Sequence, residues 1–186
     1  RSPSPRRWRS ACVQPHGRRH EGRATRERQK SLTRRRPPRR LPRRDPPDRA
    51  ALARAAGEHM YSRDRATQGL GIKLLEVGPG HARMQMVVRN DMLNGHAMCH
   101  GGFIFTLADS AFAFACNSYN VQTVAAGCTI EFLAPAYEGE CLQAEAVEQS
   151  RSGKTGVYDV VVTNPEGRKV ALMRGKSHQL KGAVVE

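Results

Sequence analysis

Hydrophobic and polar positions change their pattern near residue 48. Before this point apolar side chains are sparse, and after it they recur with the periods of helices and strands. Asp48 is a candidate N-cap for a helix that runs towards Ala66 and ends at Gly69. Residues 83–87 alternate polar and apolar side chains, as a half-buried strand does. The pattern predicts a folded domain over residues 48–186.

Residues 101–118 form the most apolar segment of the chain and predict a long helix without a solvent-facing stripe. Such a helix must be covered on nearly every side, and its alanines favour a symmetric dimer. A loop is predicted at residues 90–99. The other predicted strands, the last four of them as a meander, are residues 70–77, 124–133, 141–150, 154–163 and 169–178. The predicted fold class is α+β, an antiparallel sheet wrapped around a long central hydrophobic helix.

Charge separates the first part of the chain from the rest. The net charge is +14, and residues 1–50 hold 18 of the 31 Lys and Arg but only 4 of the 17 Asp and Glu. The remainder therefore carries 13 residues of each sign and has no net charge. Residues 1–50 also hold 8 of the 11 prolines. Such a segment cannot bury enough apolar surface to fold, so residues 1–47 are predicted to be a disordered Arg/Pro-rich extension.

Three interpretations of this extension compete: a nucleic-acid-binding tail, a targeting presequence, or upstream translation that is not part of the native product. The third is favoured because Met60 is the first methionine. The extension also lacks the interleaved aromatic residues of a nucleic-acid binder and the amphipathic period of a transit peptide. No nucleic acid is expected as a partner of the domain.

Other classes of protein are disfavoured by the remaining composition. The longest near-apolar run, residues 101–116, is shorter than the roughly 18 to 20 residues that span a bilayer, so no membrane partner is expected. Five cysteines without CxxC spacing favour reduced thiols and a cytoplasmic protein. Only His96 and His100 lie close together, in a glycine-flanked loop, so no metal site is expected.

Asp109 is an acid in the middle of the predicted apolar helix. A buried carboxylate is costly unless it is hydrogen-bonded, paired, or open to a cleft. At helical spacing only Thr106 offers it a hydroxyl. Either Thr106 or a backbone amide satisfies Asp109, or the carboxylate is a general base or nucleophile made reactive by partial desolvation. We favour the second interpretation.

The triplet His100-Gly101-Gly102 opens the same helix. Free backbone amides and the positive end of the helix dipole gather there, which makes a candidate oxyanion site. Asp109 lies two helical turns beyond Gly102, about 10 Å, which is too far for one reacting carbon to meet both groups. Two helices that run antiparallel across a dimer interface would bring them together.

These residues resemble a known family, the PaaI-type hotdog-fold acyl-CoA thioesterases of phenylacetic acid degradation. The resemblance covers residues 49–186. It is carried by NGHAMCHGG at residues 94–102, LADSAFAFACN at 107–117, CTIEFL at 128–133, KTGVYD at 154–159 and RGKSH at 174–178.

The resemblance implies hydrolysis of phenylacetyl-CoA or ring-hydroxylated phenylacetyl-CoA in phenylacetate catabolism, with no cofactor. Asp109 would attack the thioester or activate water against it, and the Gly101 N–H would bind the thioester oxygen. Asn94 would position water or substrate, and His100 would brace the loop. Family dimers place Asn94, His100 and Gly101 on one subunit and Asp109 on the other, so a homodimer or homotetramer with sites at the dimer interface is implied.

Other residues are candidates for binding the acyl-CoA. These are Gly102, Lys154, Thr155, Arg174 and Lys176. The cations among them are either solvated strand-end charges or ligands of the phosphates of coenzyme A. Six aromatic residues either line an aromatic-acyl pocket or belong to the core: Phe103, Phe105, Phe112, Phe114, Tyr119 and Phe132. A dimer that binds acyl-CoA without hydrolysing it is the alternative function.

Removal of residues 1–47 is expected to leave the melting temperature and the thioester turnover unchanged, because deleting a disordered segment removes no buried contact. Thermal unfolding and a thiol-release assay on both chains measure this. As a control, removal of residues 1–59 should cost about 1 kcal/mol through the lost N-cap alone. Instability or inactivity after the shorter deletion would show that part of the extension belongs to the fold.

Overall fold

The computed structural model describes residues 49–186. Its elements are α1 (Arg49–Arg63), α2 (Arg65–Gly69), β1 (Lys73–Gly78), β2 (His81–Val87), the 3-10 turn η1 (Asn90–Met92), α3 (Gly101–Asn117), β3 (Thr123–Phe132), β4 (Cys141–Ser152), β5 (Thr155–Thr163) and β6 (Lys169–Gln179). The predicted extension and the candidate N-cap Asp48 lie outside the described residues.

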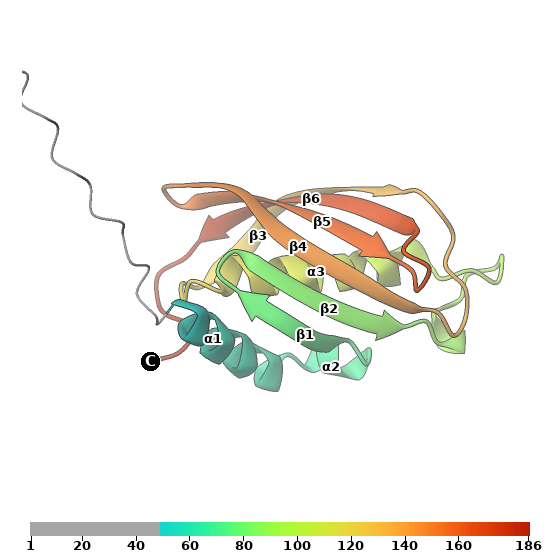
Figure 1. Ribbon diagram of the computed structural model, residues 1–186, viewed down its shortest axis with the longest axis horizontal. Coiled ribbons are helices and arrows are strands. Elements are labelled where there is room, and N and C mark those ends of the chain that lie inside the picture. Colours follow the sequence, from blue (N-terminus) through green and yellow to red (C-terminus); the bar gives the residue numbers. More distant parts are fainter. Residues whose placement is uncertain (1–48) are drawn as a thin grey trace, which may run out of the picture. The chain divides into compact units, whose positions relative to one another are not determined.

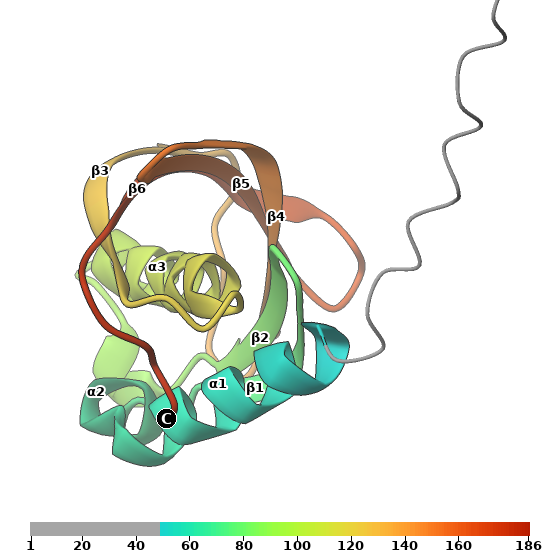
Figure 2. The same ribbon diagram turned by 90° about the vertical axis from the view of Figure 1, so that its left-hand side faces the viewer.

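The strands form one six-stranded antiparallel sheet that curls around α3. Its order is β1-β2-β4-β5-β6-β3. Figure 1 shows α3 behind the sheet, and Figure 2 shows the sheet bending over the helix when the molecule is viewed from the side. The predicted α+β class is confirmed, with the predicted helix inside the predicted antiparallel sheet.

The predicted four-strand meander is wrong in one strand. β4, β5 and β6 follow one another across the sheet, but β3 lies at the far edge and pairs with β6, with Cys128 opposite Gly175. Both β2 and β3 contact α3, so the helix is held between two distant parts of the sheet. In a meander that began at β3, β3 would pair with β4 along the edge where β2 pairs with β4 in the structure.

The predicted N-terminal helix is divided in two. Asp64 leaves the helical conformation, with φ −84° and ψ 87°, and its Oδ1 accepts a hydrogen bond from the Thr67 N–H at 3.0 Å. A side-chain cap of this kind starts a new helix, so α1 ends at Arg63 and α2 begins at Arg65. α1 packs on β1, where a Cβ on Gly57 would lie 2.7 Å from Val77 Cγ1.

The sheet covers most faces of α3, as predicted for a helix that must be covered on nearly every side, and leaves one side accessible in the single chain. Most of its side chains are buried against the sheet. One stripe at helical spacing remains half-buried or exposed in the described chain: Gly102, Phe105, Thr106, Asp109 and Ala113. The residues of this α3 stripe lie three or four positions apart and therefore share one side of the helix. A single sheet curls around the other sides only.

The buried side of α3 packs closely on β5 and β6. The Phe112 ring lies 5.5 Å from the Tyr158 ring, centroid to centroid, at an interplanar angle of 63°. A Cβ on Gly175 would lie 2.9 to 3.0 Å from three carbons of the Phe112 ring. Gly175 therefore gives the ring room against the sheet. Tyr158 is buried, and its hydroxyl donates to Glu148 Oε2 at 2.9 Å.

Substitution Gly175→Ala is expected to lower the free energy of unfolding by about 1–3 kcal/mol, because the new methyl group overpacks a core ring that has no free space. Chemical denaturation measures the loss. Gly78→Ala is the matched strand control, since no atom lies within 4 Å of its Cβ position, and it should change stability by less than about 0.5 kcal/mol. Equal effects of the two substitutions would contradict the close contact.

Candidate active site

The N-terminus of α3 presents one unused backbone amide. His100 caps the helix, and its Nδ1 accepts a hydrogen bond from the Gly102 N–H at 3.0 Å. The Phe103 N–H donates to the His100 carbonyl. Within the described part of the chain, the Gly101 N–H has no acceptor. Of the two glycines, Gly101 thus offers its amide to a ligand, whereas the amide of Gly102 is occupied.

The loop before α3 is held by Asn94. Its Oδ1 accepts from the His96 N–H at 2.8 Å and from the Met98 N–H at 3.3 Å. Ala97 has a φ of 56°, in the left-handed region, which closes the loop tightly. The Asn94 Nδ2 has no acceptor among residues 49–186. Asn94 therefore combines a structural oxygen with a free amide donor in the loop before α3.

Asp109 lies half-buried in the α3 stripe. Neither of the two structural partners considered from the sequence binds it: Thr106 Oγ1 donates instead to the Gly102 carbonyl at 2.8 Å, and no backbone amide of the described chain donates to the carboxylate. Desolvation by burial raises the pKa of the Asp109 carboxyl above its ordinary value. Asp109 is thus an unpaired acid with enhanced basicity.

Gly101 and Asp109 cannot act on one atom within a single chain. They are eight residues apart, which corresponds to about 12 Å along a helix. Both belong to the part of α3 that the sheet leaves accessible. The described chain therefore contains two half-sites, an amide end and a carboxylate.

A hollow opens beside Gly101. It has a volume of about 400 Å³ and a largely apolar lining. Its lining residues are Met98, Cys99, Gly101, Ile104, Phe132, Leu133, Ala134 and Pro135. Of the six candidate aromatic residues, Phe132 is the one that lines this hollow. Phe112 and Phe114 are buried in the core, and the other three are partly buried.

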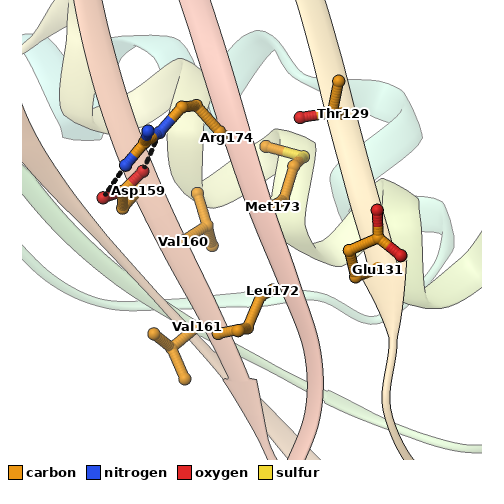
Figure 3. A pocket seen from close by; sticks show the side chains of 8 residues that line it. All are labelled: Thr129, Glu131, Asp159, Val160, Val161, Leu172, Met173 and Arg174. Atoms are coloured by element: carbon orange, nitrogen blue, oxygen red, sulfur yellow. Dashed lines mark hydrogen bonds and ion pairs between the residues drawn. The ribbon is translucent and has the colours of Figure 1, made fainter. Parts of the chain in front are cut away.

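The candidate coenzyme A ligands lie away from the α3 stripe. Gly175 faces Phe112, so its neighbours Arg174 and Lys176 project from the opposite, outer face of β6. Figure 3 shows Arg174 beside Asp159 of β5, to which it donates two hydrogen bonds of 2.7 and 2.8 Å. The Arg174 guanidinium lowers the pKa of Asp159.

Lys154 and Thr155 are at the turn between β4 and β5 and at the start of β5. Of the candidate binding residues, only Gly102 is next to the helix end. The other four, Lys154 in the β4–β5 turn, Thr155 on β5, and Arg174 and Lys176 on β6, form a second group.

Cys128 is a neighbour of Asp109 that the sequence did not single out. It faces inward from β3, and both burial and the charge of Asp109 raise the pKa of its thiol. Because the pKa is raised, the thiol stays protonated and weakly nucleophilic. The alternation along residues 128–132 was the available signal, but only the pairing of β3 with β6 places this face of the strand against α3. All four described cysteines are free, and among residues 49–186 no three His, Cys, Asp or Glu side chains gather where a metal could bind.

A six-stranded antiparallel sheet curled around one apolar helix is a hotdog fold. Comparison with known proteins agrees. Residues 96–171 match the thioesterase superfamily. The chain is 46% identical over 125 residues to the acyl-coenzyme A thioesterase PaaI of Escherichia coli (strain K12), which is 67% of this chain and 89% of that protein.

Solved structures give the same result. The structure of PaaI from the phenylacetic acid degradation operon of E. coli matches with a TM-score of 0.71 and 43% identity, over 72% of this chain and 97% of that one. The TT0310 protein of Thermus thermophilus matches with a TM-score of 0.61 and 42% identity, over 63% and 99%. A Streptococcus mutans protein solved with acetyl CoA matches with a TM-score of 0.58 and 25% identity, over 60% and 90%.

The chain belongs to the PaaI-type acyl-CoA thioesterases of the hotdog-fold thioesterase superfamily, and it is a thioester hydrolase. No helix within residues 49–186 is long and apolar enough to cross a membrane.

Asp109→Asn is expected to raise the melting temperature at neutral pH. Because the pKa of Asp109 is raised in the folded state, the protonated carboxyl is more compatible with the fold than the carboxylate. The stability that the protonated form contributes is lost as the pH rises through the raised pKa, so the carboxylate lowers stability at neutral pH. The gain should shrink as the pH falls towards the ordinary Asp value of 3.8. Thermal unfolding across pH measures it.

Asp159→Asn is the control of opposite sign, because Arg174 lowers the pKa of Asp159. It should lower the melting temperature at neutral pH, and this loss should fade as the pH falls through the lowered pKa. A destabilised Asp109→Asn protein at neutral pH would mean that the carboxylate has a partner.

Proposed function

We propose that the protein hydrolyses phenylacetyl-CoA or ring-hydroxylated phenylacetyl-CoA to the free acid and coenzyme A, in phenylacetate catabolism. The observation that carries the proposal is the free Gly101 N–H on the same helix as the unpaired Asp109. The names of the relatives support it, since E. coli PaaI is an acyl-coenzyme A thioesterase of a phenylacetic acid degradation operon. The activity is assigned to residues 48–186.

In this proposal Asp109 starts the reaction, either by attacking the thioester carbon or by taking a proton from a water that attacks it. The carbonyl oxygen becomes an oxyanion, which the Gly101 N–H stabilises at the positive end of α3. The tetrahedral intermediate collapses with cleavage of the C–S bond. Coenzyme A leaves as a thiolate and needs no general acid. Where Asp109 attacks directly, the acyl group is left on Asp109 as a mixed anhydride, which water then hydrolyses. On either route water supplies the hydroxyl of the acid and the proton of the thiol.

The site is proposed to form between two copies of the chain. Gly101 and Asp109 are too far apart in one helix, and antiparallel α3 helices would bring Gly101 of one copy to Asp109 of the other. The α3 stripe and the edge strand β3 support this assignment, because the stripe is only partly covered and β3 exposes Val124 and Phe132. A homodimer is the smallest active unit, and a homotetramer would contain two such pairs.

The neighbouring residues have positioning roles in the proposal. His100 holds the first turn of α3 through Gly102, which leaves the Gly101 amide pointing out of the helix. Asn94 presents its free Nδ2 to water or to the substrate. Gly102 acts through its lack of a side chain, because its N–H is occupied.

The phosphates of coenzyme A are assigned to the second group of residues. Lys154 and Lys176 are exposed cations, and Thr155 adds a hydroxyl at the start of β5. Arg174 already donates two hydrogen bonds to Asp159 in the described chain. A bound phosphate would therefore share the guanidinium with Asp159. The Streptococcus mutans relative was solved with acetyl CoA, which supports a CoA thioester as the ligand class.

Thiol release from phenylacetyl-CoA by the purified protein tests the function. Asp109→Asn is expected to lower the turnover by about 100-fold or more, because a positioned acid–base group or nucleophile is lost, while binding of coenzyme A persists. Cys128→Ser is the matched neighbour control and should stay within about threefold of the parent enzyme. Normal turnover in folded Asp109→Asn would contradict the mechanism. Binding without hydrolysis by the parent protein would identify a non-catalytic acyl-CoA-binding dimer.

Mixing two inactive variants tests the shared site. Asp109→Ala and Gly101→Val subunits should be nearly inactive alone, the second because a side chain at residue 101 would press on the Phe132 ring beside the amide. Subunit exchange should restore up to about a quarter of the parent activity, since hybrid dimers contain one intact site. The control is exchange between two differently tagged Asp109→Ala proteins. No recovery despite proven exchange would exclude a site built from two chains.

A further inference from the structure

Phe132 is the only large aromatic side chain beside the free amide of α3 in the described chain. A Cβ on Gly101 would lie 3.0 Å from Phe132 Cζ and 3.3 to 3.4 Å from its two Cε atoms. The tip of the ring therefore rests over the first turn of α3. Phe132 is 52% exposed, in contrast to the core ring of Phe112, which is 1% exposed. Its ring has a free face that another flat group can contact.

The hollow beside this ring has the chemistry of an acyl site. Its volume of about 400 Å³ is within the range of ligand pockets, about 300–1,000 Å³. Apolar side chains from three segments line it: Met98 before the helix, Ile104 in its first turn, and Leu133 after β3. No charged side chain lines it. Apart from the Gly101 N–H, which the proposed function assigns to the carbonyl oxygen, this lining favours an apolar group over a phosphate.

We infer that Phe132 selects the acyl group, and that the hollow accepts an acyl chain with a flat apolar ring close to the thioester carbonyl. The inference rests on the proposed function, in which the carbonyl oxygen binds the Gly101 N–H. With the oxygen there, the first carbons of the acyl chain lie next to the Phe132 ring. Aromatic rings attract one another in edge-to-face or offset arrangements, so an arylacetyl group gains contact that an acetyl group cannot make.

A second role for Phe132 must be separated from this one. Phe132 ends the edge strand β3, so a second copy of the chain that pairs along β3 would also cover it. In that case truncation of the ring would weaken the dimer and lower turnover for every acyl group alike. Acyl selection instead changes the ratio between a ring-bearing substrate and a small one.

The experiment compares kcat/KM for phenylacetyl-CoA and acetyl-CoA in the full chain and in Phe132→Ala, Phe132→Leu and Phe132→Tyr. Tyr137→Ala removes a ring of similar exposure, 47%, outside the hollow, and Val124→Ala changes the same strand at its other end. Light scattering at the assay concentration gives the oligomeric mass of each variant. Calorimetry with non-hydrolysable thioether analogues of both ligands gives the same ratio from binding.

Phe132→Ala is expected to lower the ratio of phenylacetyl to acetyl activity by about 10-fold or more, with acetyl-CoA turnover within about threefold of the parent. Phe132→Leu should give an intermediate loss, and it keeps the inference testable if Phe132→Ala does not fold. Phe132→Tyr keeps the ring and should retain the ratio. Tyr137→Ala and Val124→Ala should leave the ratio unchanged.

An unchanged ratio in Phe132→Ala overturns the inference, whether or not the oligomeric mass falls. The proposed function fails separately, if the parent enzyme hydrolyses neither thioester. The calorimetric ratio then still tests Phe132, and absence of a binding preference for the arylacetyl analogue overturns its role as well.

Discussion

Helix α3 carries so many apolar side chains that it must be kept out of water, and the sheet has the shape that this requires. Phe112 and Leu107 are buried against the sheet, and β6 leaves out a side chain at Gly175, where the Phe112 ring packs closest. Burying a large side chain contributes about 1.5–3 kcal/mol. A flat sheet would cover one side of α3 only, and curling of β3 and β2 towards the helix covers the others.

The remaining side of α3 is where chemistry is possible. Asp109 could not lie against the sheet without a partner, because an unpaired buried carboxylate is strongly unfavourable. The same side exposes the first turn of the helix, where the Gly101 N–H is left without an acceptor in the described chain. The part of α3 that the sheet leaves accessible therefore unites two features that the core excludes, a charge and an unsatisfied amide. In the proposed function, a second copy of the chain supplies the missing half of each site.

Local signals in the sequence predicted α3 and most strands to within one or two residues, because apolar runs and turn residues lie next to one another in the chain. The position of β3 was not predictable in this way, since Cys128 meets Gly175 across 47 residues and across the sheet. The division of the first predicted helix into α1 and α2 depended on a single side-chain N-cap, Asp64. The contrast between Gly101 and Gly102 depended on where the His100 ring points, and the pairing of Arg174 with Asp159 on strand register.

The raised pKa of Asp109 connects stability with reactivity. A general base works best when its pKa is close to the operating pH, and an ordinary carboxylate is too weak a base for this. Desolvation at the α3 stripe moves the pKa in the required direction, at the expense of folding stability. A salt bridge would have stabilised the acid and lowered its pKa, as Arg174 does for Asp159. The absence of a partner in the described chain therefore lowers folding stability and raises the basicity of Asp109. The proposed function relies on this, because a thioester, whose thiolate leaves unaided, would need little more than the Asp109 carboxylate and one amide.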